Sequence, residues 1–298
     1  METGFLIIHP GALGDVLQAV PALRGLRAVA PAAPITVVGQ PRLARLLVEL
    51  GAAQQARTFD GFGLEALFVD APTPAALADA MSGVSHVVSW FGSRDETYRR
   101  RLRALAPRAI VAPPVPADDT PVWRHLLATL AEWGLSLPER REPLRPPADP
   151  GSANTGRARL VIHPGSGGDW KRWPVERFAE VIRALRRDRA FEVLVHQGPA
   201  DAEPAQRLLA LLEGDAGVLL EPDLPRLAAV LGGARAYLGG DSGVSHLAAA
   251  VGAPSVLLFP SATYRRWTPW SPTAVAIELQ GVDGDVERAR EALTRAFG

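Results

Sequence analysis

Three glycine-rich segments of the chain carry the side chains that could do chemistry. The first runs from Gly11 to Leu23 and places Asp15 at an expected helix start, where a carboxylate caps free backbone N–H groups. The same carboxylate, at the rim of a domain, could instead take a proton from a hydroxyl group. The residues alone leave both roles open. Pro21 lies inside the same helical pattern and predicts a kink or a later helix start.

The second segment runs from His163 to Pro174 and has the composition of an anion-binding turn. Ser166 and glycines such as Gly167 offer a hydroxyl and backbone N–H groups, and Lys171 adds a compact positive charge. The spacing differs from that of a P-loop, because no Ser or Thr follows the lysine. Of the 32 basic residues, 31 are Arg and only Lys171 is Lys, which favours a functional role for it over a solvated surface position.

The third segment runs from Tyr237 to Phe259 and joins two apolar strands through a Gly-Gly-Asp-Ser-Gly turn and a helix of small residues. The N–H groups of Ser242 and Gly243, at the start of that helix, would point at a bound phosphate. His246 lies one turn later and is either part of the site or a buried histidine of the core. Polar, flexible residues between two apolar strands favour a ligand site.

Parallel sheets must position these segments, because short apolar runs alternate with stretches of helical length and periodicity. The first half predicts strands at 4–8, 35–39, 66–69, 84–89 and 109–112, and helices at 15–29, 41–50, 74–81, 97–105 and 121–133. The second half predicts strands at 159–163, 191–196, 217–220, 235–238, 254–259 and 274–278, and helices at 174–188, 202–213, 223–231, 243–251 and 284–297. Trp170 and Trp173 are expected to be packing residues.

The chain is expected to form two similar domains. Leu6–Asp15 and Leu160–Asp169 share seven of ten residues, and the proline-rich stretch 137–156 has no apolar periodicity. We therefore predict doubly wound α/β domains that face each other across a cleft. Their expected limits are 1–140 and 158–298, with a linker at 141–157.

Composition excludes several classes of protein. The chain has 298 residues, 47% of them apolar, which is enough for two buried cores. It has no cysteine, so disulfides, thiol catalysis and thiolate metal sites are excluded. With 32 basic and 32 acidic residues it is not a generally basic nucleic-acid binder, and no nucleic-acid partner is expected. No targeting or spanning segment is visible, so we expect a cytoplasmic protein.

Together the three segments resemble glycosyltransferase family 9, the heptosyltransferase family that builds the lipopolysaccharide inner core from ADP-activated heptose. The most specific match begins at Asp241 and reads Asp-Ser-Gly-Val-Ser-His-Leu-Ala-Ala-Ala, followed by Gly-Ala-Pro-Ser-Val-Leu-Leu-Phe. The Gly-Asp-Val-Leu-Gln-Ala-Val-Pro-Ala-Leu opening and the Pro-Gly-Ser-Gly-x-x-x-Lys-Arg-Trp-Pro segment match in the same order. The resemblance implies a GT-B fold of two Rossmann-like domains, with the acceptor held by the first, the nucleotide sugar by the second, and the last helix packing back onto the first domain.

The resemblance also implies an inverting, metal-independent transfer of heptose or a related sugar from an ADP-activated donor to a lipopolysaccharide-core-type acceptor. The catalytic residues would be Asp15, as the general base, and Lys171, whose charge would stabilise the leaving diphosphate in place of a metal. The residues implied for the donor are Ser166, Gly167 and Lys171 at the diphosphate, Asp241, Ser242, Gly243 and His246 around the sugar and diphosphate, and Glu203, or else Asp201, at the ribose. No cofactor and no metal site are expected, because the donor is itself a substrate and no metal-ligand cluster stands out in the sequence.

On the acceptor side the resemblance points to His9 and Gly14. His9 stands six residues before Asp15, where the family usually has Lys or Arg. Arg94 and Arg99 belong to an arginine-rich stretch that would meet an anionic glycolipid or the cytoplasmic face of the inner membrane, or would be a solvated helix face.

Other functions stay open at this point. A protein that binds a nucleotide sugar without transferring it, or an epimerase on the same fold, would carry the same donor segments. A nicotinamide-dependent oxidoreductase is disfavoured, because neither half has a clean G-x-G-x-x-G after its first strand.

Overall fold

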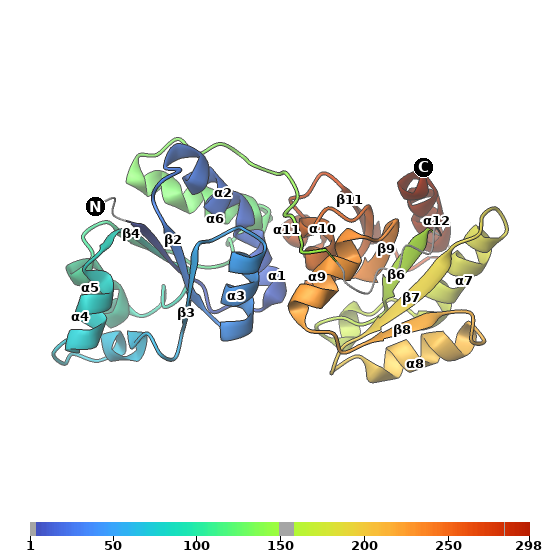
Figure 1. Cartoon of the computed structure of the whole chain (residues 1–298), viewed down its shortest axis with the longest axis horizontal. Coiled ribbons are helices and arrows are strands. Elements are labelled where there is room, and N and C mark those ends of the chain that lie inside the picture. The colour runs from blue at the N-terminus through green and yellow to red at the C-terminus, as the bar shows by residue number, and fades with distance from the viewer. Residues whose placement is uncertain (1–3, 149–157, 283) are drawn as a thin grey trace. The chain divides into compact units, whose positions relative to one another are not determined.

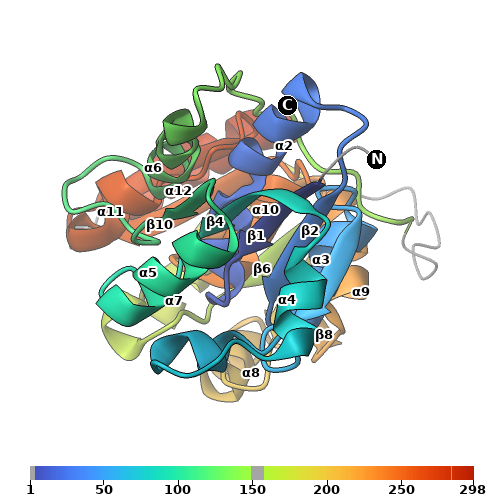
Figure 2. The ribbon, with the colours of Figure 1, turned by 90° about the vertical axis from the view of Figure 1, so that its left-hand side faces the viewer.

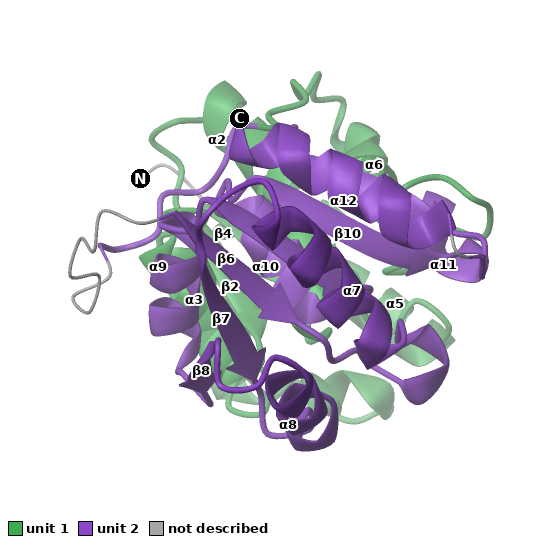
Figure 3. Cartoon of the chain, turned by 90° about the vertical axis from the view of Figure 1, so that its right-hand side faces the viewer, with its two compact units in different colours: residues 1–141 green, residues 142–298 purple. Residues whose placement is uncertain are grey.

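The computed structural model describes residues 4–148, 158–282 and 284–298. The chain divides into two compact units, residues 1–141 and 142–298 (Figures 1 and 3). The division falls at the start of the expected linker, of which residues 149–157 lie outside the described residues. Among the helices of the described residues, none has the length and apolar character needed to cross a membrane.

The described part of unit 1 is a parallel five-stranded sheet in the order β3-β2-β1-β4-β5. Its strands are β1 (Gly4–Ile8), β2 (Ile35–Gly39), β3 (Gln55–Thr58), β4 (Val84–Ser89) and β5 (Ala109–Val111). Its helices are α1 (Leu13–Gln18), α2 (Val20–Val29), α3 (Pro41–Glu49), α4 (Ala75–Met81), α5 (Glu96–Leu105) and α6 (Val122–Thr129), with the 3₁₀ turns η1 (Leu64–Phe68) and η2 (Leu130–Trp133). α2 packs against α6, and α3 packs on β2 and β3 (Figure 2).

Two local features of unit 1 bear on the sequence predictions. The break expected near Pro21 is confirmed, because α1 ends at Gln18 and α2 begins at Val20 with the proline in its first turn. The strand predicted at 66–69 is wrong, since this apolar run forms η1 instead. The third strand is β3, which is largely exposed at the edge of the sheet and therefore lacks the apolar pattern that marks a buried strand.

The described part of unit 2 is a parallel six-stranded sheet in the order β11-β10-β9-β6-β7-β8. Its strands are β6 (Arg159–His163), β7 (Glu192–Gln197), β8 (Gly217–Leu220), β9 (Ala236–Gly240), β10 (Ser255–Pro260) and β11 (Ala274–Leu279). Its helices are α7 (Val175–Arg186), α8 (Ala202–Leu211), α9 (Leu224–Gly232), α10 (Gly243–Ala250), α11 (Ser261–Trp267) and α12 (Gly284–Phe297), with the 3₁₀ turn η3 (Asp169–Lys171).

The core of unit 2 lies between its sheet and the helices that cover it. Phe178 and Ile182 of α7 and Leu293 of α12 are fully buried and join one apolar cluster with the central strands. α12 packs beside α7 in Figure 3 and also contacts β9, β10 and β11. Packing of this last helix onto the first domain stays a prediction.

Both sheets have a switch point, where the order of the strands reverses. In unit 1 it lies between β1 and β4, and in unit 2 between β6 and β9. Parallel sheets bind ligands beyond the carboxyl ends of the strands at such points. The first glycine-rich segment follows β1, the second follows β6, and the third includes the turn after β9. The fold therefore places all three segments where a ligand site is expected.

Candidate functional site

The switch point of unit 2 brings the second and third segments together. His163, at the end of β6, pairs in register with Gly239 of β9. A Cβ atom added to Gly240 would lie 3.8 Å from the carbonyl oxygen of Lys171 and 3.9 Å from that of Gly165. The loop after β6 thus packs directly against the end of β9.

Lys171 and Asp241 form the central ion pair of this region. The Lys171 Nζ lies 3.1 Å from Asp241 Oδ2, and the two side chains are 22% and 5% exposed. The same ammonium lies 5.5 Å from the centre of the Trp170 ring. Two predicted site residues from different segments therefore meet, and together they place one positive and one negative charge at the start of α10.

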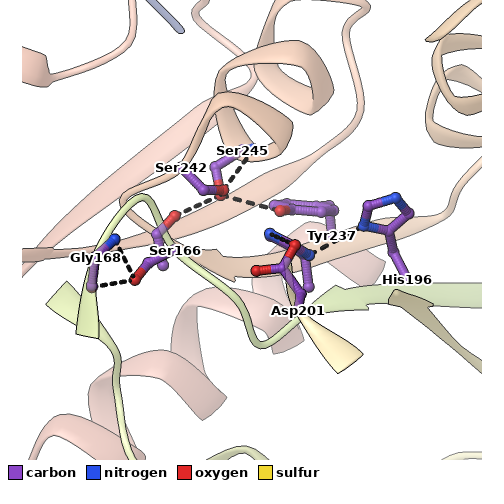
Figure 4. Close-up of polar contacts among 9 residues, drawn as sticks. Ser166, Gly168, His196, Asp201, Tyr237, Ser242 and Ser245 are labelled. Atoms are coloured by element: carbon purple, nitrogen blue, oxygen red, sulfur yellow. Dashed lines mark hydrogen bonds and ion pairs between the residues drawn. The ribbon is translucent and has the colours of Figure 1, made fainter. Parts of the chain in front are cut away.

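Ser242 caps α10, because its Oγ accepts a hydrogen bond of 3.2 Å from the Ser245 backbone N–H. Ser245 in turn donates its hydroxyl proton to the carbonyl oxygen of Gly240, at 2.5 Å. Since a hydroxyl has one proton, the Ser245 oxygen must accept from the Tyr237 hydroxyl, 2.9 Å away (Figure 4). These contacts lock the turn at the carboxyl end of β9 to the first turn of the helix.

His246 is buried in the same helix, with its ring centre 6.2 Å from that of Phe259 and 6.1 Å from that of Trp267. Burial lowers the pKa of His246 to about 4, with Asp241 raising it and Lys171 lowering it further. The imidazole is therefore neutral at pH 7. His246 is therefore packed like a core residue beside the charges of Asp241 and Lys171, and its role in binding a ligand stays a prediction.

The turn after β6 carries Ser166 and Gly167. The Ser166 hydroxyl donates to the carbonyl oxygen of Gly168, at 2.6 Å (Figure 4). A Cβ atom on Gly167 would meet no atom within 4 Å. The turn is therefore held by a local hydrogen bond and presents open space at Gly167.

The two tryptophans of this segment differ. Trp173 is buried and packs edge-on against Phe178, at 5.0 Å between ring centres, as predicted. The packing role predicted for Trp170 is wrong, because its side chain is 64% exposed.

The acidic residues near the start of α8 lie in different surroundings. Glu203 is 69% exposed, and its Oε2 is 3.9 Å from Arg172 Nη1. Asp201 is only 14% exposed and lies 3.8 Å from His163 Nε2. The His163 Nδ1 atom is 3.0 Å from His196 Nδ1. Sequence reasoning assigned no role to His196, although a polar residue at the carboxyl end of an apolar strand is a usable signal.

In unit 1, Asp15 lies in the first turn of α1, partly exposed, and its Oδ2 accepts a hydrogen bond of 2.9 Å from the Ala12 backbone N–H. The capping role is therefore confirmed. The role of Asp15 as a base stays a prediction.

His9 lies beside Asp15. A Cβ atom on Gly11 would come within 2.8 Å of both His9 Cε1 and Asp15 Cβ, so the glycine is what allows the two side chains to approach. The His9 ring meets Trp90 edge-on, at 5.6 Å between ring centres. Burial lowers the pKa of His9 to about 4, so a neutral imidazole stands where the family usually has a cation. Gly14 lies one residue before Asp15 in α1, partly exposed.

The arginines predicted for the acceptor are spread over the turn before α5 and the helix itself. Arg94 is exposed in the turn. Arg99 pairs with Glu96 at 2.8 Å, and Arg100 pairs with Asp70. Acidic partners therefore compensate part of the positive charge of this stretch.

One Asp-x-Asp sequence, residues 283–285, lies outside the three glycine-rich segments. Asp283 lies outside the described residues. Asp285 accepts hydrogen bonds from the backbone N–H groups of Gln280 and Gly281 and pairs with Arg288, so its carboxylate is used within the fold.

Comparisons with known proteins identify the family and the fold of the chain. The family model described as glycosyltransferase family 9 (heptosyltransferase) matches residues 98–292. Lipopolysaccharide heptosyltransferase 3 of Escherichia coli is 31% identical over 124 residues, 40% of this chain and 36% of the relative. Lipopolysaccharide heptosyltransferase 1 of Pseudomonas aeruginosa is 38% identical over 108 residues, 36% of this chain and 30% of the relative. The alignments thus span about a third of each relative's length.

Solved structures resemble the chain over nearly its whole length. Escherichia coli ADP-heptose lipopolysaccharide heptosyltransferase II has a TM-score of 0.74 at 21% identity and covers 99% of this chain and 98% of its own. Escherichia coli heptosyltransferase WaaC, solved with ADP, has a TM-score of 0.72 at 18% identity and covers 98% and 99%. The predicted fold class, GT-B with two Rossmann-like parallel-sheet domains, is confirmed. The chain belongs to glycosyltransferase family 9, the heptosyltransferase family.

Proposed function

We propose that this protein transfers heptose, or a related sugar, from an ADP-activated donor to a lipopolysaccharide-core-type acceptor, with inversion at the anomeric carbon and without a metal. The observation that carries the proposal is the Lys171–Asp241 pair at the start of α10, at the switch point of unit 2. Family membership supports the reaction class, and the ADP in the similar WaaC structure supports the nucleotide.

The donor diphosphate binds at the start of α10. The helix contributes backbone N–H groups from Ser242 and Gly243 and the positive end of its dipole. Lys171 contributes an ammonium, and the turn of Ser166 and Gly167 adds N–H groups and a hydroxyl. Asp241 accepts hydrogen bonds from sugar hydroxyls, and the neutral imidazole of His246 lines the sugar-diphosphate site beside it.

Unit 1 supplies the group that activates the acceptor. As the acceptor oxygen forms its bond to the anomeric carbon, its proton passes to the Asp15 carboxylate, and the bond from that carbon to the β-phosphate oxygen breaks. Attack opposite the leaving group inverts the configuration. The electron pair of the broken bond leaves with ADP, whose growing negative charge is stabilised by Lys171 and the α10 N–H groups.

The remaining acceptor contacts come from the same end of unit 1. Gly14 lets the acceptor approach the backbone beside Asp15, and neutral His9 lines the site without adding charge. Arg94 and Arg99 meet acidic groups of the glycolipid, and we infer that the protein works at the cytoplasmic face of the inner membrane, where such acceptors are built.

The experiment combines ADP-heptose, a deacylated lipopolysaccharide-core acceptor and the full chain, with and without EDTA. The expected result is ADP release coupled to a glycosylated product of inverted configuration, seen by NMR, at a rate that EDTA leaves unchanged. Donor binding without product for any core acceptor would instead favour a binding protein.

A further inference from the structure

A buried pair of imidazoles lies at the carboxyl ends of β6 and β7. His163 ends β6, His196 lies near the end of β7, and both side chains are almost fully buried. Their Nδ1 atoms are 3.0 Å apart (Figure 4). Because two facing nitrogens form a hydrogen bond only when one of them carries a proton, this contact fixes one imidazole as donor and the other as acceptor.

The Asp201 carboxylate lies near the other ring nitrogen of His163, beyond hydrogen-bond distance, and acts on the tautomer of that ring through its charge. Its Oδ2 lies 3.8 Å from His163 Nε2. Burial lowers the pKa of His163 to about 4 and that of His196 to about 3, so both rings are neutral at pH 7. An ionised carboxylate favours the His163 tautomer with the proton on Nε2. His163 Nδ1 then accepts, and His196 Nδ1–H donates.

The Asp201 carboxylate is held between two glycine turns. A Cβ atom on Gly165 would lie 2.0 Å from Asp201 Oδ1, and one on Gly198 would lie 2.8 Å from Oδ2. Asp201 is the N-cap residue of α8, yet its side chain makes no capping hydrogen bond. The carboxylate is thus placed against the turn that carries Ser166, and the helix does not use it.

We propose that His196, acting through His163, is a positioning residue that holds Asp201 as the carboxylate for the ribose hydroxyls of the donor. This inference rests on the proposed function. An acidic residue beyond the second strand, next to the glycine turn of the first, is where Rossmann-like folds bind ribose hydroxyls. Glu203, the residue favoured from the sequence, is far more exposed and faces Arg172.

The test compares the binding of ADP and 2′-deoxy-ADP by calorimetry, using the full chain. The wild type is expected to bind the deoxynucleotide about tenfold more weakly, the effect of one hydrogen bond to a charged group. Asp201→Ala should bring this ratio close to one, and the matched control Glu203→Ala should keep it. His196→Leu should lower the ratio to about threefold, and His196→Asn, whose amide supplies N–H near the position of Nδ1, should restore it.

Thermal unfolding of each variant first establishes that it is folded. A ratio unchanged in Asp201→Ala or His196→Leu, or a ratio lost in Glu203→Ala, would overturn the inference. Failure of the wild type to bind ADP at all would instead overturn the proposed function. Nitrogen-15 NMR of the imidazoles tests the histidine pair without any nucleotide. The expected tautomers carry the proton on His196 Nδ1 and on His163 Nε2, and the opposite tautomers would overturn the inference.

Discussion

Replacing Lys171 by Arg conserves the positive charge at the donor site but exchanges a compact ammonium for a longer, planar guanidinium. The Lys171 Nζ is 3.1 Å from Asp241 Oδ2, which at an effective dielectric constant of about 20 corresponds to a gross Coulomb attraction of about 5 kcal/mol. A guanidinium keeps most of this attraction, and the variant should remain folded. The longer, planar group cannot occupy the ammonium's position, so a charge-assisted hydrogen bond to the diphosphate is lost. Such a bond contributes about 1.5–3 kcal/mol, which predicts an ADP affinity about 10- to 150-fold lower.

The assay is calorimetric titration with ADP, accompanied by thermal unfolding. Arg177→Lys is a matched control on α7, where the arginine pairs with Glu180 at 3.1 Å on the surface, and it should leave ADP affinity unchanged. Lys171→Met leaves the buried Asp241 carboxylate without its cation and should lower stability by about 3–5 kcal/mol. Lys171→Met combined with Asp241→Asn should recover that stability but not ADP binding. An ADP affinity of Lys171→Arg within twofold of the wild type would show that the Lys171 ammonium makes no specific hydrogen bond to the diphosphate.

Three further outcomes follow from the structure. Tyr237→Phe removes a buried hydroxyl that donates to Ser245 and should cost about 1–3 kcal/mol of stability in denaturant titrations, with ADP affinity kept. Trp173→Ala should cost about 3–5 kcal/mol, whereas exposed Trp170→Ala should stay within about 0.5 kcal/mol in the same titrations. Burial lowers the pKa of His9, His163 and His246 to about 4 in the folded chain, so the unfolded chain binds more protons than the folded chain between pH 6.5 and 4. The contribution of these three rings to the free energy of unfolding is therefore complete above pH 6.5 and is lost as the pH falls toward 4. Denaturant titrations at pH 7, 5.5 and 4.5 should show this decline, and constant stability would contradict the buried, neutral state of these rings.

Much of the architecture could be predicted because buried parallel strands leave a strong apolar signal. The runs at 4–8 and 254–259 correspond to β1 and β10, each of which has a paired strand on either side. β3 was missed because an exposed edge strand buries too little surface to need apolar residues. The apolar run after it became η1, since a run of five residues is compatible with either conformation.

The candidate site could be predicted only where it coincides with local motifs. Lys171 and Asp241 each stand in a recognisable segment, but their pairing depends on β6 and β9 being neighbours across the switch point. His196 lies outside every motif, and its contact with His163 arises from the pairing of β6 with β7. Long-range contacts of this kind leave no trace in the spacing of residues along one chain.

The most direct test of the proposed transfer is the activity of Asp15→Asn. Asparagine still accepts the hydrogen bond from the Ala12 N–H, so the start of α1 is preserved while the base is removed. Asp223→Asn, at the N-cap of α9, is the matched control, because its carboxylate also accepts a hydrogen bond of 2.9 Å from a backbone N–H three residues away, that of Arg226. Asp15→Asn is expected to bind ADP-heptose like the wild type but to release ADP about 10²–10⁴-fold more slowly, the usual contribution of a general base, while the control keeps full activity. Wild-type turnover by Asp15→Asn would show that Asp15 is not the base and leave it with its capping role alone.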